Sequence, residues 1–196
     1  MHKDLYLFTR YERLWHWFQV VVITLLMVTG LEVHGSFSLM GFEKAVFLHN
    51  YAGITWAVAF AFFVFWIATT GEWKHYIPTT RKMALVVRHY AYGIFKGEPH
   101  PVPATERAKH NPLQRIVYLL FSAVLLPFQM VTGFLYYTAN APFSFASGVS
   151  LKTLGALHTF GALLILAFVI LHIYMITTGP TLFSHLKAMI TGWERG

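Results

Sequence analysis

The chain has no cysteine and few charged residues. Disulfide bonds, thiolate-bound metals and cysteine-held iron–sulfur clusters are therefore excluded within it. Only 12% of its 196 residues are Asp, Glu, Lys or Arg, against about 25% in an ordinary soluble domain. A chain of this length forms at most one domain, so we treat residues 1–196 as one unit.

The sequence is instead rich in long apolar blocks. Apolar residues make up 56% of the chain, and they concentrate in Leu14–Val33, Val46–Thr70, Ile116–Thr138 and Leu151–Thr177. Each block exceeds or matches the roughly 20 helical residues that cross the hydrocarbon core. Lys152, at an edge, is the one basic residue within them, and Glu32 lies near the end of the first. Because lipid offers the backbone no hydrogen bonds, the sequence predicts an all-α, four-helix transmembrane bundle.

The distribution of the net charge of +7 along the chain indicates membrane orientation rather than nucleic-acid binding. The two tails and the loop between the second and third blocks hold 13 of the 15 Lys and Arg residues. With four spans these three segments share one side of the membrane, and the positive-inside rule makes that side cytoplasmic. We therefore expect both termini in the cytoplasm and no nucleic-acid partner.

The central loop, residues 71–115, is the only long connection. Thr79 and Thr80 are candidate caps for a short amphipathic helix, Arg81–Phe95, at the membrane surface. The loops on the opposite side are too short to form a domain. Chemistry on that outer side must therefore come from another subunit.

Four of the 11 histidines fall in or at the spans: His16, His49, His158 and His172. His16 and His172 lie towards the cytoplasmic side, and His49 and His158 towards the outer side. Ionisable residues are rare in membrane helices and usually functional. The alternative is a neutral histidine bonded to a neighbouring helix, and four histidines at two matched depths argue against it.

The last span carries two of these histidines on one face. His158 and His172 are two heptads apart, so their rings point within roughly 40° of each other at depths about 21 Å apart. A zinc or copper site would need three or four ligands at one level, often with a carboxylate or thiolate. Each level here has two histidines, which suits a haem with one imidazole on each face. Two b-type haems, held without covalent bonds because Cys-x-x-Cys-His is absent, fit better.

Several glycines lie near these histidines: Gly30, Gly53, Gly133, Gly155 and Gly161. Small residues let a ring approach the backbone, but glycine is also common where membrane helices meet. The glycines are therefore consistent with haem sites without requiring them.

At these residues the sequence resembles the di-haem membrane cytochrome b family. That family includes the γ subunit of formate dehydrogenase and the cytochrome b subunits of nickel–iron hydrogenase and thiosulfate reductase. The stretches that carry the resemblance are ERLWHW around His16, LHNYAGI around His49, KHNPLQR before the third span, ALHTFGALLILAFVILHIYM around His158 and His172, and HLKAMITGW near the C-terminus. It covers nearly the whole chain and departs from the formate dehydrogenase subunit in the central loop and the short C-terminal tail.

The resemblance implies a quinone or menaquinone site near His172, with Asn111 and Gln114 helping to bind it. Asn111 has a second interpretation, since it is a good N-cap for the third span with Pro112 at the first helical position. Arg10, Arg13 and Arg115 are weaker candidates for pairing with haem propionates, because most basic residues here anchor the cytoplasmic side.

The sequence thus predicts a multi-pass cytochrome b of the bacterial cytoplasmic membrane, with no catalytic residue of its own. It would pass electrons between the quinone pool and a partner subunit, an iron–sulfur protein or c-type cytochrome on the outer side. Two rivals stay open: a haem carrier or transporter, which needs an exchangeable haem with an open ligand, and a passive anchor for a soluble enzyme, which needs no matched histidines.

Overall fold

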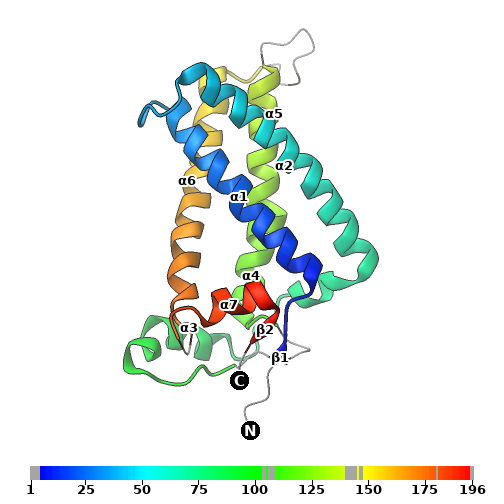
Figure 1. The fold of residues 1–196 in the computed structure, drawn as a ribbon, viewed down its shortest axis with the longest axis vertical. Helices are drawn as coiled ribbons and strands as arrows, with labels where there is room; N and C mark the ends of the chain where they lie inside the picture. Colours follow the sequence, from blue (N-terminus) through cyan, green and yellow to red (C-terminus); the bar gives the residue numbers. More distant parts are fainter. Residues whose placement is uncertain are drawn as a thin grey trace. The chain divides into compact units, whose positions relative to one another are not determined.

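The computed structural model describes residues 5–102, 105, 109–139, 145, 148–179 and 181–194, and most of them are helical (Figure 1). The elements in chain order are β1 (Leu5–Tyr6), α1 (Arg10–Val33), α2 (Phe42–Thr70), η1 (Glu72–Tyr76), α3 (Met83–Ala91), η2 (Gly93–Lys96), α4 (Pro112–Leu120), η3 (Phe121–Leu125), α5 (Leu126–Thr138), α6 (Leu151–Ile176), α7 (Ser184–Thr191) and β2 (Trp193–Glu194). Four helical stretches are long and apolar enough to cross a membrane: α1, α2, α4 to α5, and α6. The expected helical class and the four long apolar helices are confirmed.

The chain divides into two compact units. The span unit comprises Trp15–Trp66 and Leu125–Val169, and the tail unit comprises Met1–Leu14, Ile67–Val124 and Ile170–Gly196. Most of the surface of the four long helices is exposed, with only 11–17% of the residues in each apolar window buried. Apolar helices with so little burial suit a lipid solvent, which does not penalise exposed apolar side chains.

Capping explains why the first helix starts earlier than its apolar block. The Thr9 hydroxyl accepts the Glu12 N–H at 3.3 Å, and the Glu12 carboxylate accepts the Thr9 N–H at 2.7 Å. This reciprocal capping box satisfies two N–H groups at the helix start. The helix therefore begins at Arg10, in a polar turn that a hydrophobic pattern does not detect.

Within the span unit, Glu32 shapes the connection from α1 to α2. One of its carboxylate oxygens accepts the N–H groups of Leu39, Met40 and Gly41 at 2.7–2.8 Å. Further along these helices, the indole of Trp56 donates to Gln19, and Trp15 stacks on Phe63 with ring centroids 4.6 Å apart. A charged cap at one end and apolar packing along the length fix α1 against α2.

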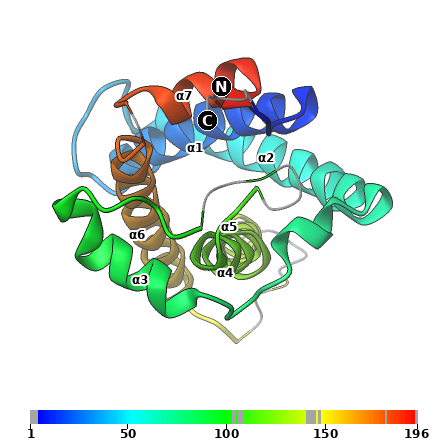
Figure 2. The same cartoon turned by 90° about the horizontal axis from the view of Figure 1, so that it is seen from below.

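The tail unit joins the two ends of the chain. β1 and β2 pair antiparallel, with Leu5 opposite Glu194 and Tyr6 opposite Trp193. Figure 2 shows α7 beside the start of α1, where the Arg13 guanidinium donates to the Ile190 carbonyl. These contacts hold the two terminal segments of the tail unit together.

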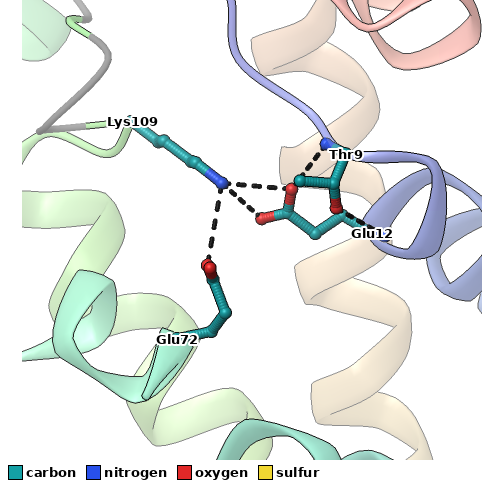
Figure 3. Close-up of polar contacts among 4 residues, drawn as sticks. All are labelled: Thr9, Glu12, Glu72 and Lys109. Atoms are coloured by element: carbon teal, nitrogen blue, oxygen red, sulfur yellow. Dashed lines mark hydrogen bonds and ion pairs between the residues drawn. The ribbon is translucent and has the colours of Figure 1, made fainter. Parts of the chain in front are cut away.

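A buried ion-pair cluster ties three distant segments of the tail unit together (Figure 3). The Lys109 ammonium lies 2.8 Å from a carboxylate oxygen of Glu12 and 3.7 Å from one of Glu72. The side chains of Lys109, Glu12 and Glu72 are only 9%, 15% and 28% exposed. Because a buried charge needs a partner, this cluster holds the start of α1, η1 and the segment before α4 in one arrangement.

The central loop contains the short helix α3, which starts two residues later than the range expected from the sequence. Its N-cap is Lys82, in a left-handed conformation with φ of 62° and no side-chain cap. Thr79 instead uses its hydroxyl to accept the Arg81 N–H at 3.3 Å. The expected threonine cap is therefore wrong, because Thr79 closes a local turn before the helix.

The third span changes its winding midway. A π-helical segment, Phe121–Leu125, separates α4 from α5. Pro127 lies two residues after it. A proline lacks the N–H that an α-helix needs and clashes with the carbonyl four residues back. The wider π turn accommodates that clash without ending the span.

Candidate functional site

The span unit brings together His49, in the second turn of α2, and His158, in α6. Their ring centroids are 6.1 Å apart, and the ring planes lie at 85°. Both side chains are half-buried. The sequence analysis expected these two histidines at one depth, and the structure places their rings close together and nearly perpendicular.

Each of these histidines contacts one threonine of a neighbouring helix. The Thr29 oxygen lies 3.0 Å from His49 Nδ1, and the Thr132 oxygen lies 3.1 Å from His158 Nδ1. Both threonine hydroxyls also donate to the carbonyl four residues back, Leu25 at 2.7 Å and Phe128 at 2.8 Å. The two histidines therefore share the same kind of threonine contact.

A glycine follows each threonine and clears space for the imidazole. A Cβ added at Gly30 would lie 3.1 Å from His49 Cε1, and one at Gly133 would lie 2.9 Å from His158 Cε1. Both distances are shorter than ordinary contacts, so a larger residue would displace the ring. Gly161 similarly faces Gln129 and Phe128, whereas Gly53 meets only Leu26 at 3.9 Å.

These threonines were missed by the sequence analysis, although a signal for them exists. The tetrapeptide Met-Val-Thr-Gly occurs at residues 27–30 and again at 130–133. Each copy lies in the helix that precedes a histidine-bearing helix. A search for identical short words within apolar spans would have found the pair, whereas a search for repeats at a fixed period does not.

The separation of the two rings fits a metal held between them. A metal–imidazole bond is about 2.0–2.1 Å long and the ring centre lies about 1.1 Å beyond the nitrogen, so two imidazoles on opposite sides of one metal have centroids about 6 Å apart. Among the residues that the structure describes, no group of three or more His, Cys, Asp or Glu side chains is placed to hold a single metal ion. Two imidazoles alone suit the iron of a macrocycle, which supplies the other ligands itself.

Gln129 occupies the space beside His158. Its amide nitrogen lies 3.2 Å from Nδ1 and 3.1 Å from Nε2 of that ring. Gln129 is only 8% exposed, and its side-chain carbonyl oxygen is buried without a hydrogen-bond partner. An orphaned buried oxygen is costly, and turning the amide away would free His158 Nε2 to bind a metal.

The other two span histidines fall in different units. His16 is in the span unit, where its ring lies edge-on to Trp17 with centroids 5.3 Å apart. His172 is in the tail unit, two heptads after His158 on α6. Both are half-buried. Their pairing at one haem stays a prediction.

Asn111 caps the third span as its second interpretation predicted. Its side-chain oxygen accepts the Gln114 N–H at 2.9 Å, and Gln114 Oε1 accepts the Asn111 N–H at 3.0 Å. Pro112 follows at the start of α4. The side-chain oxygens of Asn111 and Gln114 thus accept the hydrogen bonds of the capping box. Their amide nitrogens remain available for other contacts.

The amide nitrogen of Asn111 reaches a polar cluster from the central loop. It donates to the Tyr90 hydroxyl at 3.0 Å and lies 3.5 Å from His100 Nε2. The His89 and His100 rings are 4.9 Å apart, and His89 is buried with Nδ1 lacking a hydrogen-bond partner. Burial raises the pKa of Tyr90, and burial, with the nearby His89 and His185, lowers the pKa of His100. Neutral groups that can exchange protons therefore surround Asn111.

Two of the three candidate arginines are already engaged with the backbone. Arg13 donates to the Ile190 carbonyl, and Arg115 donates to the carbonyls of His110 at 3.1 Å and Ile77 at 3.4 Å. Arg10 is exposed. Their assignment to haem propionates stays a prediction, and in this structure Arg13 and Arg115 hold the tail unit together.

The family model for prokaryotic cytochrome b561 matches residues 7–192. The chain belongs to this family. It is similar to the putative cytochrome YdhU of Escherichia coli strain K12, with 33% identity over 98% of this chain and 76% of that protein. It is also similar to a probable Ni/Fe-hydrogenase B-type cytochrome subunit of Rhodobacter capsulatus, with 27% identity over 87% of this chain and 73% of that protein. No solved structure matches the chain.

Membership confirms the resemblance to membrane cytochrome b subunits drawn from the histidine-containing stretches. A member of this family binds haem b and has an electron-transfer role in a bacterial membrane. The four apolar helices supply that membrane location. The chain is therefore a membrane cytochrome b.

Proposed function

We propose that this cytochrome b carries electrons across the membrane through two haems, between the quinone pool and a partner redox subunit. The observation that carries this proposal is the His49–His158 pair, with ring centroids 6.1 Å apart and matching threonine and glycine neighbours. A passive anchor would have no need of two such imidazoles. The chain is then an electron-transfer module rather than a complete enzyme.

His49 and His158 are the proposed axial ligands of the outer haem. The support is threefold: the ring separation, the glycines that make room for each ring, and the orphaned Gln129 oxygen beside His158. His16 and His172 are the proposed ligands of the haem nearer the tails. Their support is the spacing on α6, which puts His158 and His172 on one face at two depths.

Haem iron supplies reversible one-electron transfer when it is bound. Two imidazoles of the chain would hold it, which would leave no open position for oxygen. A haem carrier would instead need an exchangeable ligand position. Burial among apolar side chains such as those of the spans is one means of setting a haem potential.

The quinone is proposed to react on the cytoplasmic side of the membrane, near His172, Asn111 and Gln114. Asn111 presents its amide beside Tyr90 and His100, and a quinone that gains or loses electrons must also exchange protons. The concentration of Lys and Arg in the tails and central loop makes that side cytoplasmic. Asn111 and Gln114 would then both cap α4 and contact the quinone.

The partner is proposed to dock on the opposite, outer side. The hydrogenase-type relative is a subunit by name, and the short outer loops of this chain hold no cysteine that could carry a cluster. An iron–sulfur subunit or a c-type cytochrome would fill that role in the cytoplasmic membrane of a bacterium.

A haem count together with a difference spectrum tests this function. The purified protein should give a reduced-minus-oxidised spectrum of low-spin b-type haem. Acid–acetone should extract that haem, and pyridine haemochrome should give about two haems per chain. Haem that exchanges readily with free haem would favour the carrier, and a protein without haem would favour the anchor.

A further inference from the structure

The threonine hydroxyls beside His49 and His158 already donate their protons to backbone carbonyls. The Thr29 hydroxyl donates to the Leu25 carbonyl at 2.7 Å, and the Thr132 hydroxyl donates to the Phe128 carbonyl at 2.8 Å. A hydroxyl has one proton and two lone pairs. Towards Nδ1 of His49 and His158, each threonine oxygen can therefore only accept.

A threonine oxygen that can only accept requires an N–H on the ring nitrogen that it faces. A neutral imidazole with its proton on Nδ1 has a free lone pair on Nε2.

The amide of Gln129 is compatible with this assignment. Its nitrogen carries only donors and lies 3.1 Å from Nε2 and 3.2 Å from Nδ1 of His158. With the ring proton on Nδ1, the amide can donate only to Nε2, through the lone pair that a metal would use. The assignment of the proton to Nδ1 therefore rests on the threonine oxygens.

We propose that Thr29 and Thr132 are positioning residues that hold His49 and His158 in the Nδ1–H form and aim Nε2 at the haem iron. This inference rests on the proposed function, because it takes the two histidines as axial ligands. Hydrogen bonds to the distal nitrogen fix the orientation of a ligating histidine and increase its basicity. The bond strengthens when the iron is ferric, since the more positive metal makes Nδ1–H a better donor.

The chain offers a matched set of variants. Thr29→Val and Thr132→Val keep the shape of threonine and remove the acceptor, whereas Thr29→Ser and Thr132→Ser keep the hydroxyl. Thr138→Val is the control, because Thr138 makes the same bond to the carbonyl four residues back, that of Phe134 at 2.9 Å, at the exposed end of α5. Each variant is purified as the full chain, and its haems are titrated potentiometrically and counted.

Each valine variant should raise the midpoint potential of one haem, because the ferric state loses more than the ferrous state. Each substitution removes a single hydrogen bond to the ligating ring, so the shift should be modest. We expect about a threefold change in the reduction equilibrium, or about 28 mV at 59 mV per tenfold change. The double valine variant should shift the same haem about ninefold, and the serine and Thr138→Val variants should match the wild type.

Loss of that haem in the valine variants but not in the serine variants would equally support positioning. Unchanged potentials in Thr29→Val and Thr132→Val, with both haems bound, would overturn the inference and leave the proposed function standing. An equal shift or haem loss in the serine variants or in Thr138→Val would also overturn it. Failure of the proposed function looks different: the wild-type protein would lack haem, or His49→Ala would keep both haems.

Discussion

The two compact units of this cytochrome b are built in different ways. In the span unit, His49 and His158 have the same neighbours, a threonine and a glycine from two copies of Met-Val-Thr-Gly. In the tail unit, His172 shares its unit with an ion-pair cluster, a capping box and an unrepeated group of histidines and tyrosines. Charge inside the bilayer is expensive, and the histidines of the span unit accordingly have neutral partners, whereas the tail unit contains paired charges.

The largest effect is expected from removing a buried charge from the tail unit, which should lower the stability of that unit and leave the histidine pair of the span unit unchanged. Lys109→Ala leaves two largely buried carboxylates, Glu12 and Glu72, without their cation. Removing one partner of a buried ion pair costs about 3–5 kcal/mol, and we expect the lower end because Glu72 is 28% exposed. The measurement is thermal unfolding in detergent, with limited trypsin cleavage of the central loop.

Arg88→Gln is the control for that variant. The Arg88–Glu98 pair is 3.3 Å long but 63% and 41% exposed, and exposed pairs contribute about 0.2–1 kcal/mol. Stability that falls equally in both variants would show that burial of Lys109 does not matter. Loss of the outer haem in Lys109→Ala would show that the two regions are not independent.

A second prediction separates the two roles of Asn111. Asn111→Ser keeps a capping oxygen and removes the amide that reaches Tyr90, whereas Asn111→Ala removes both. Alanine at an N-cap costs about 1 kcal/mol, and serine should cost little. If the amide binds the quinone, both variants should slow quinol-driven haem reduction about tenfold, which corresponds to about 1.4 kcal/mol in the barrier.

Stopped-flow reduction of haem-loaded protein by a short-chain quinol gives these rates. Gln114→Ala belongs in the same series, because Gln114 completes the capping box. If Asn111→Ser and Gln114→Ala both reduce haem at the wild-type rate, then neither residue binds the quinone and both only cap α4.

Much of the fold was predictable because apolar length alone requires four membrane helices. The start of α1 was not, because Thr9 and Glu12 form a capping box in a polar turn. That His49 and His158 lie at one level could be predicted from their positions in the second and fourth spans. Thr29 and Thr132 could not be singled out, because an isolated threonine in an apolar helix carries no signal of its own. The contacts of Lys109 with Glu12 and Glu72 join residues far apart in the chain. Nothing local in the sequence specifies such contacts.

The smallest expected effect is a pH dependence confined to the tail unit. Burial, with His89 and His185 nearby, lowers the pKa of His100 below its ordinary value, which is about 6.5. Below pH 6.5 the unfolded chain therefore binds a proton that the folded loop does not, and stability falls as the pH decreases towards the lowered pKa. Tyr90 and Asn111, which also face His100, do not titrate in this range.

Protease cleavage of the central loop at pH 7.5 and pH 5.5 reports this effect. Wild-type protein should be cleaved faster at the lower pH, and His100→Gln should reduce the difference. A pH dependence that is identical in His100→Gln would assign the effect to another group.

The most direct test of the account is the number of haems in three variants, His49→Ala, His158→Ala and the double variant. His34→Ala, an exposed histidine at the end of α1, is the control. If His49 and His158 share one iron, pyridine haemochrome should give about one haem per chain in all three variants, and about two in the control. Two haems in either single variant, or none in the double variant, would contradict the account.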